Sequence, residues 1–386
     1  MLASLALASC SKNQVLDTPK DAIKFNVVAD KATRAANVYC NNNPITAFNV
    51  WASYKNASNY VSYFANDLVK GANGSWGTEG IVRYWPAFAE TGSSLTFYAL
   101  AGTTSTFDSW AATSTEAPVP TISNYQVNTT VASQEDLLYS RSQAYIAKAT
   151  NADLNFRHAL SLIEFKAKNS TSNLHVKVTK VCVGGVYGQG DFTFPTAATS
   201  TNYADHDDDA TTEDNTNNAT EKAAWVAEGS DVEYVAGVNL AEDETSIAVV
   251  KGATEAVSLT VSNETDKNYT NSMLLMPQEK AALGETDGTA YMGVYCEIYN
   301  MAGDTYADSD IMVFKGWALV GVDVNWVLGK KYIYTFNFVD GNGGTDGGEE
   351  PEDPNPGTDP VLFTIDYNVT VDDFDLMGDS TVEMKK

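Results

Sequence analysis

The sequence is poor in the side chains that most often catalyse reactions or bind metals. Only three histidines, His158, His175 and His206, occur among 386 residues. There is no Gly-x-Ser-x-Gly elbow and no His-Glu-x-x-His motif, so no catalytic triad or zinc site of known spacing can be assigned. We therefore expect no enzymatic activity, no cofactor and no bound metal.

Basic side chains are scarce as well. The chain has 24 Lys and Arg against 50 Asp and Glu, which gives a net charge of −26. Such a charge repels phosphate backbones and anionic lipid head groups, so nucleic acid is not an expected partner. No apolar run is long enough to cross a membrane as a helix. The hydrophobic share of 44% still permits sizeable cores, and the length predicts two or three domains.

Cysteine is rare, and the four that occur are Cys10, Cys40, Cys182 and Cys296. Small residues precede Cys10 at the end of a short apolar run, which resembles the lipobox of bacterial lipoproteins. Residues 1–10 are therefore expected to be a signal peptide, with Cys10 as the lipidated residue. The other three cannot all pair within one chain. Cys182 and Cys296 lie in strand-like runs and are expected to be small buried hydrophobic residues, with disulfide or metal use as the alternative.

Short runs of alternating apolar and polar residues make up most of the chain. Residues 45–52 and 331–338 are examples, rich in β-branched and aromatic side chains. This alternation predicts strands with one face buried, as in antiparallel sandwiches. Turn-rich clusters divide the runs into two expected β-sandwich domains, residues 35–152 and 153–340. A helical pattern occurs at residues 135–148 and predicts one short helix.

Two polar segments interrupt the strand pattern. Residues 197–222 are of low complexity and predict a mobile loop, because they cannot bury enough apolar area to offset their ordering entropy. The acidic run at residues 205–209 lacks the spacing of a calcium loop, so we interpret it as solvated. Residues 341–360 are rich in Gly, Pro and acidic residues and predict a flexible acidic linker, roughly 25 Å long as a coil.

The region after this linker, residues 361–386, begins with a strand of unbroken alternation. A strand with one apolar face needs a hydrophobic groove, and a lone strand beyond a linker has none of its own nearby. Pairing within its own chain is the alternative interpretation. The apolar positions of this strand are Val361, Phe363, Ile365, Tyr367, Val369 and Val371.

A shorter strand near the other end of the chain has the same alternation. Its apolar positions are Ile23, Phe25 and Val27. The polar stretch of small residues that follows suits an exposed, cleavable segment. It contains Arg34, which is the only arginine before Arg83. An ordinary solvated residue is the alternative interpretation of Arg34.

Three further segments give the chain a resemblance to a known family. Residues 156–165 (FRHALSLIEF) resemble the motif that opens the second domain of the fimbrillins, the type V pilins that Gram-negative anaerobes export as lipoproteins. Residues 274–278 (LLMPQ) resemble the Leu-Pro-Gln turn of that family, and residues 329–336 its closing strand. The resemblance implies an all-β chain of two antiparallel β-sandwich domains, transthyretin-like with Greek-key connections, and a C-terminal donor-strand appendage.

The resemblance also implies a structural role in a pilus. The precursor would be held at the cell outer membrane only through lipid on Cys10, with a leader of residues 11–34 that completes the N-terminal domain. An Arg-specific protease would cut between Arg34 and Ala35. The C-terminal strand, residues 361–371, of another pilin subunit would then fill the emptied groove, and the product would be an extracellular fimbria.

Glycan binding by a lipoprotein that stays anchored is the second class of function. Trp51, Trp76, Trp85 and Trp110 would stack on sugar rings if they were exposed, although aromatic residues of sandwiches more often lie in the core. Host glycans or proteins are therefore further candidate partners. The position of the subunit in a pilus, at the shaft, tip or anchor, stays open.

Overall fold

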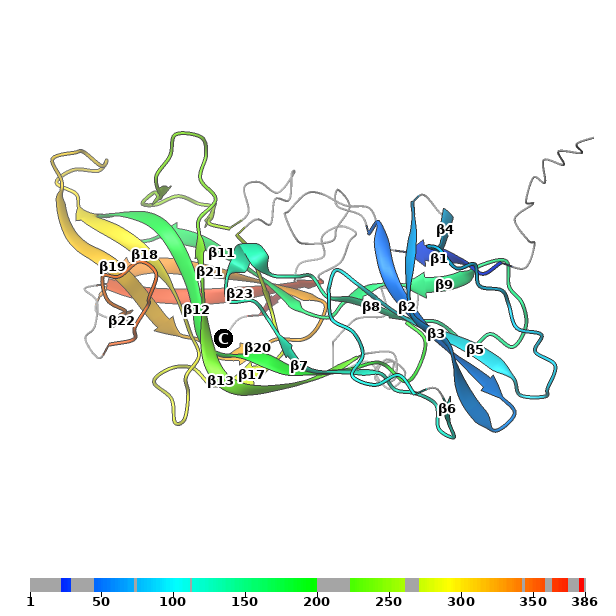
Figure 1. The fold of residues 1–386 in the computed structure, drawn as a ribbon. Helices are drawn as coiled ribbons and strands as arrows, with labels where there is room; N and C mark the ends of the chain where they lie inside the picture. Colours follow the sequence, from blue (N-terminus) through cyan, green and yellow to red (C-terminus); the bar gives the residue numbers. More distant parts are fainter. Residues whose placement is uncertain are drawn as a thin grey trace, which may run out of the picture.

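A computed structural model shows an elongated all-β molecule with two lobes (Figure 1). The N-terminal strands form one lobe and the C-terminal strands the other. The residues that the structure describes are 22–28, 45–72, 75–111, 113–199, 223–260, 271–341, 344–357, 363–373 and 382–384.

Helical structure in this part of the chain is limited to one 3-10 turn, η1 (Val131–Ser133). The short helix expected at residues 135–148 is wrong. Strand β8 (Leu138–Arg141) occupies that segment, because Leu138 and Tyr139 are buried by pairing in a sheet, and such tertiary contacts override local helical pattern. No helix among the described residues is long and apolar enough to cross a membrane.

The N-terminal lobe is built on one nine-stranded sheet. Its other strands are β1 (Lys24–Val28), β2 (Ala47–Asn56), β3 (Asn59–Ala72), β4 (Ser75–Thr78), β5 (Ser94–Ala101), β6 (Thr113–Ser114), β9 (Ala152–Asn155) and β10 (Arg157–His158). The strand order is β10-β8-β5-β2-β3-β4-β1-β9, with β6 attached to β3. All neighbouring pairs are antiparallel except β1 and β9, which are parallel.

This sheet curls around its own core. In a flat sheet, β1 and β5 would lie about 19 Å apart, because four strand spacings separate them. Instead, the ring centroids of Phe25 on β1 and Phe97 on β5 are 5.3 Å apart. Phe25 also contacts Phe48 and Phe64, at 5.8 and 6.4 Å. The two halves of the sheet therefore face each other across one apolar core, like the layers of a sandwich.

The C-terminal lobe contains two facing sheets. Its strands are β7 (Thr121–Gln126), β11 (Ser161–Asn169), β12 (Leu174–Thr193), β13 (Ala224–Gly237), β14 (Ile247–Val249), β15 (Val257–Ser258), β16 (Met273–Leu275), β17 (Glu279–Lys280), β18 (Tyr291–Asn300), β19 (Ile311–Gly321), β20 (Val324–Asn325), β21 (Lys330–Asp340), β22 (Thr345–Asp346), β23 (Phe363–Asp373) and β24 (Val382–Met384). One sheet has the order β15-β11-β21-β23-β24, with β16 on β11. The other has the order β13-β12-β18-β19-β22, with β7 and β14 on β12, and β17 pairs with β20 separately.

The boundary expected at residue 152 does not separate these sheets cleanly. Strand β7 precedes that boundary but pairs with β12 in the C-terminal lobe. The 20-residue length of β12 explains this, because a strand of that length extends past its own lobe and accepts a partner from the other. Cys182 on β12 and Cys296 on β18 are free and fully buried, which confirms their expected role as small hydrophobic residues.

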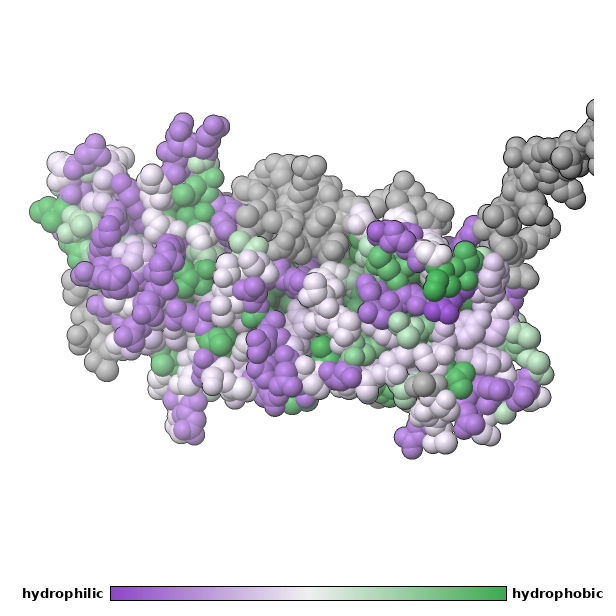
Figure 2. Space-filling view, viewed as in Figure 1, coloured by the Kyte–Doolittle hydropathy of each residue, from purple (hydrophilic) through white to green (hydrophobic). Residues whose placement is uncertain are grey.

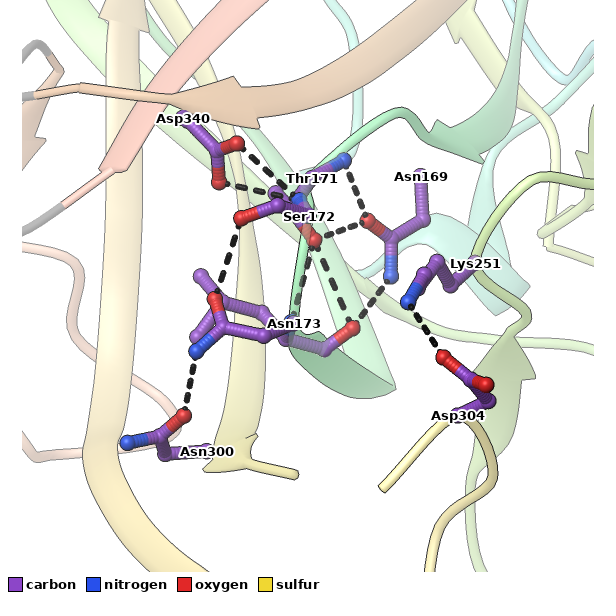
Figure 3. Close-up of polar contacts among 9 residues, drawn as sticks. Asn169, Thr171, Ser172, Asn173, Lys251, Asn300, Asp304 and Asp340 are labelled. Carbon is purple, nitrogen blue, oxygen red and sulfur yellow. Dashed lines mark hydrogen bonds and ion pairs between the residues drawn. The ribbon is translucent and has the colours of Figure 1, made fainter. Parts of the chain in front are cut away.

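Strand directions define an outer end of the C-terminal lobe. β11 follows β10 of the N-terminal sheet and so runs away from the junction, and β21 is parallel to it. β23 is antiparallel to β21, so it starts at the outer end, where Phe363 pairs with Asp340. Polar contacts tie this end together (Figure 3): Ser172 donates its backbone N–H to Asp340, and Asn173 donates its side-chain amide to Asn300, at 2.6 Å.

The two lobes share apolar contacts at their junction. β5 is buried on both faces, so Phe97 lies in the N-terminal core while Tyr98 belongs to the core of the C-terminal lobe. Phe194, which follows β12, inserts among N-terminal rings. Its centroid lies 5.0 Å from Phe107 and 5.8 Å from Tyr139. The lobes are therefore joined by a packed aromatic cluster.

We expect the lobes to unfold together because of this cluster. Phe194→Ala should lower the free energy of unfolding by about 3–5 kcal/mol and split the thermal transition in two. Differential scanning calorimetry measures both effects. Val119→Ala, at a side chain that is 45% exposed, is the control and should change stability by less than about 0.5 kcal/mol. One unchanged transition in Phe194→Ala would contradict a coupled junction.

Candidate site for strand exchange

Strand β1 fills a position between β4 and β9, which we call the β1 site. Lys24 and Phe25 pair antiparallel with β4, and Phe25 to Val28 pair parallel with β9. The apolar face of the strand points into the core: Ile23 is 2% exposed and Phe25 is 0% exposed. Val27 is half-buried against the same core.

Loss of β1 would open this sheet. The strand is held by two register pairs with β4 and four with β9. Without it, both neighbours would have unpaired backbone edges, and Phe48, Phe64 and Phe97 would lose the ring that covers them. An apolar slot between two open strand edges is a site that an added strand can fill.

Polar contacts fix the register and direction of β1. On its outer face, Asn26 donates its side-chain amide to Asp153, at 2.9 Å, and accepts one from Asn151, at 2.6 Å. At its start, the backbone N–H of Ile23 donates to the carbonyl of Arg83, at 2.8 Å. The strand therefore enters beside residue 83 and runs along β9 towards the junction.

The C-terminal strand is paired within its own chain. β23 lies antiparallel to β21 along its whole length, from Phe363 to Asp373. Ile365 is 3% exposed and belongs to the core of the C-terminal lobe, while Val361 lies outside the described residues. The alternative interpretation, pairing within its own chain, therefore holds for this state of the chain, and donation of the strand to another subunit stays a prediction. The core of the C-terminal lobe also covers part of three further side chains of β23, those of Tyr367, Val369 and Val371.

β23 has one full-length partner and one short partner. On one side β21 pairs with all of it, but on the other β24 pairs only with Val369, Thr370 and Val371. No other described strand pairs with that second edge. Away from those three residues, the described strands leave backbone groups on this edge of β23 unpaired, and such an edge is open to a further strand.

Residues 344–357, which composition predicts to be part of a flexible linker, are docked against the outer face of the second sheet. We call this segment the docked linker. Tyr295 donates its hydroxyl to the carbonyl of Glu349, and Trp317 donates its indole N–H to that of Glu350, both at 2.9 Å. β22 pairs with β19 at Ala318 and Leu319. The sequence signal for this docking is the aromatic residues on the outer faces of β18 and β19, which the linker shields from solvent.

A half-buried carboxyl makes the docking sensitive to pH. Burial raises the pKa of Glu233, against a hydrogen bond from Tyr291 that lowers it, and the nearby Asp353 raises it further. The Tyr291 hydroxyl lies 2.6 Å from Glu233 and 3.2 Å from the carbonyl of Pro354 in the docked linker. When Glu233 is protonated, its carboxyl group can donate a hydrogen bond to the Tyr291 hydroxyl oxygen. The single hydroxyl hydrogen of Tyr291 is then free to donate to the carbonyl of Pro354.

The N-terminal processing residues of the sequence analysis, Cys10, Arg34 and Ala35, lie outside the described residues. Cys40 and the acidic run at residues 205–209 do so as well. In the part of the chain that is described, no group of three His, Cys, Asp or Glu side chains is placed to hold a metal ion.

Comparison with known proteins identifies the family. Residues 33–350 match the fimbrillin-like family along most of the chain. The chain belongs to the fimbrillin-like family. Among solved structures, a fimbrial protein of Bacteroides vulgatus superposes with a TM-score of 0.54 at 16% identity, over 92% of this chain and 100% of that one, which supports the fold. No curated protein matched this fimbrillin-like sequence.

Two more distant structures are also similar. A Bacteroides uniformis protein assigned to cell adhesion superposes with a TM-score of 0.46 at 13% identity, over 92% of this chain and 98% of that one. The fimbrial anchor protein Mfa2 from Porphyromonas gingivalis gives a TM-score of 0.35 at 9% identity, over 91% and 97% of the two chains.

Family membership confirms three expectations from the sequence: the fimbrillin resemblance, the all-β sandwich fold and the absence of enzymatic function. The family consists of structural fimbrial and adhesion proteins at the cell surface. Two of the three histidines make contacts within the fold: His158 pairs with the buried Asp136 at 2.8 Å, and His175 stacks on Tyr306 at 4.3 Å. His206 lies outside the described residues.

The tryptophans proposed as a sugar platform are part of the fimbrillin cores. Trp51, Trp76 and Trp85 are 3%, 6% and 8% exposed, so their ring faces are covered by protein. Trp110 is half-buried and donates its indole N–H to Ser62, at 2.7 Å. These four side chains therefore do not form an exposed platform.

The β1 site depends on one ring, and this is testable. Phe25→Ala should destabilise the N-terminal lobe by about 3–5 kcal/mol, because it leaves a cavity among three other phenylalanines. Urea unfolding measures the loss. Lys24→Ala, at the exposed neighbour on the same strand, should change stability by less than about 0.5 kcal/mol. Equal effects of the two changes would refute the assignment of β1 as a core strand.

The docking of the linker should weaken as the pH rises. In the folded chain the pKa of Glu233 is raised above its ordinary value of 4.5. The stabilisation that the protonated carboxyl gives to the docked linker is therefore complete below pH 4.5 and is lost as the pH rises through the raised pKa. The indole N–H signal of Trp317 in an NMR titration reports the docked state. Glu233→Gln, which always carries donors, should flatten the profile, and an unchanged profile in this variant would disprove the linkage.

Proposed function

We propose that this fimbrillin-like chain is a structural fimbrial subunit that polymerises when the C-terminal strand of a neighbouring subunit replaces β1. In the proposed cycle, the precursor is anchored at the outer membrane through acylated Cys10. An Arg-specific protease then cuts between Arg34 and Ala35. Residues 361–371 of another pilin subunit enter the β1 site, and the chain becomes part of an extracellular fimbria.

The position of β1 in the chain is the observation that supports this proposal most. This core strand lies in an N-terminal segment that a single cut would separate from the rest of the chain. β1 ends at Val28, before Arg34 and Ala35, so cleavage there leaves no covalent link between β1 and its site. Its remaining attachments are then non-covalent: six register pairs, the polar contacts of Ile23 and Asn26, and the buried face of the strand.

Burial favours the incoming strand. β1 places three apolar side chains on its inward face, whereas residues 361–371 have six large apolar side chains at alternate positions. Each fully buried large side chain contributes roughly 1.5–3 kcal/mol. On β21, Ile365 is buried but Tyr367 and Val369 are only half-buried, so these two side chains can gain burial in the β1 site. These gains offset the cost of association.

The other arginines support Arg34 as the cleavage residue. The chain contains four arginines. Arg83 is held by two hydrogen bonds to Asp67, at 2.7 and 3.1 Å. The Arg141 guanidinium lies 5.6 Å from the ring centroid of Tyr98, and Arg157 is 5% exposed. A protease that needs an extended and accessible arginine therefore has poor substrates in the folded lobes.

The proposal predicts protease-dependent polymers. Treatment of the full chain with an Arg-specific protease should yield a ladder of oligomers that resist dodecyl sulfate, and mass spectrometry should find Ala35 at the new N-terminus. Arg34→Ala should prevent the ladder. A chain that ends after Gly357, which keeps the docked linker but lacks the terminal strand, should be cleaved and yet remain monomeric.

A matched pair of variants tests the role of the strand face. Ile365→Asp places a charge on the buried face of β23 and should abolish the ladder, whereas Asn368→Asp changes an exposed position and should leave it intact. Oligomers of normal length in the chain that ends after Gly357 would overturn the proposed exchange.

A further inference from the structure

Two groups of exposed hydrophobic side chains lie outside the cores. The first, the β1-side patch, has exposed fractions of 67%, 48% and 42% at Ile81, Val82 and Tyr84. The second, the outer-end patch, has 72%, 48% and 42% at Ile311, Met312 and Val313. Figure 2 shows hydrophobic surface both near β1 and β4 and at the far end of the C-terminal lobe. Large apolar side chains grouped in this way mark contact surfaces.

The β1-side patch adjoins the start of β1. Tyr84 forms an isolated bridge with Ala22, and the carbonyl of Arg83 accepts the backbone N–H of Ile23. The patch therefore lies where a strand that runs in the direction of β1 would enter the β1 site.

The outer-end patch adjoins the start of β23. Ile311 pairs with Asn300, which accepts the side-chain amide of Asn173 in the polar cluster of Figure 3. The same cluster contains Asp340, the register partner of Phe363. Both β19 and the C-terminal strand thus begin at this end of the lobe.

The outer-end patch also has an open backbone edge. Its strand, β19, pairs with β18 along one side, but on the other side β22 pairs only with Ala318 and Leu319. No other described strand pairs with β19 from Ile311 to Lys315. An apolar segment with a free edge is a template for contact with another chain.

The docked linker limits how far apart two exchanging subunits can be. It is tied down up to Gly357, whose backbone N–H donates to the carbonyl of Asp346, at 2.8 Å. Phe363 is six residues further along the chain, a span of about 20 Å at full extension. While the linker stays docked, a donated strand must therefore start within that distance of its own subunit, next to the outer end.

We infer that the outer-end patch of one subunit packs against the β1-side patch of the next copy of this chain. The inference rests on the proposed strand exchange and adds a second contact beside the exchanged strand. A donated strand with the direction of β1 can place Phe363, the first residue of β23, where Ile23 now lies, next to Tyr84. The short span from Gly357 then brings the two patches together. Such a contact joins unlike surfaces, so it repeats along a filament without closing.

Charge placement in the two patches tests this contact. Ile81→Lys and Ile311→Asp each put a charge into the proposed interface, and the variant with both changes puts opposite charges on its two sides. Val226→Lys is the control, because Val226 is 63% exposed but lies on β13 opposite Asp191, in the half of β12 near the junction, and a lysine there places no like charge opposite Asp191. After Arg-specific cleavage, the median polymer length is measured by electron microscopy, and circular dichroism verifies the fold.

The contact predicts a roughly tenfold shorter polymer for each single variant, a normal polymer for Val226→Lys, and substantial recovery in the double variant. A folding defect in the single variants would persist in the double variant, so it could not explain a recovery of polymer length. Normal polymer lengths in both single variants, with a normal wild-type ladder, would overturn the contact and leave strand exchange standing. Absence of a ladder from cleaved wild-type protein would instead refute the exchange itself, and the contact with it.

A photo-crosslinking amino acid at position 312 gives an independent readout. In polymers mixed from isotopically light and heavy subunits, the crosslinked peptide should contain residues 81–84 of the other copy. Crosslinks confined to a single chain, or to other surfaces of the neighbour, would rule the contact out.

Discussion

The N-terminal lobe depends on the burial of one ring among three others. Phe25 closes the core against Phe48, Phe64 and Phe97. Because it comes from a short strand near the N-terminus, the sheet remains complete only while that strand, or another of the same pattern, occupies its place. The hydrophobic effect therefore makes the site demand a strand without specifying which chain supplies it.

The fold could be predicted from the sequence where alternation was regular. The apolar positions Ile23 and Phe25, and those of the strand at residues 331–338, are buried as a period of two requires. The short helix expected at residues 135–148 was wrong, because Leu138 and Tyr139 find partners in a sheet that the local pattern does not reveal. Alternation reports that a face is buried, but not which strand lies beside it.

The C-terminal region shows the same limit more sharply. The pattern of residues 361–371 required a groove, and β21 of the same chain meets that requirement, as the β1 site of a neighbour would under the proposed exchange. Composition also predicted a flexible linker, since Gly, Pro and acidic residues rarely form a core. Its docking depends on side chains of β18 and β19, such as Tyr295 and Trp317, whose donors reach carbonyl groups of the linker. No local pattern within the linker encodes those partners.

The structure of the assembled fimbria, determined by cryo-electron microscopy, would identify the strand that occupies the β1 site. We predict that the strand between β4 and β9 is the C-terminal strand of the adjacent subunit, with an apolar side chain in the place of Phe25. A polymer in which β1 remains in that place, with β23 still paired to β21 of its own chain, would contradict it.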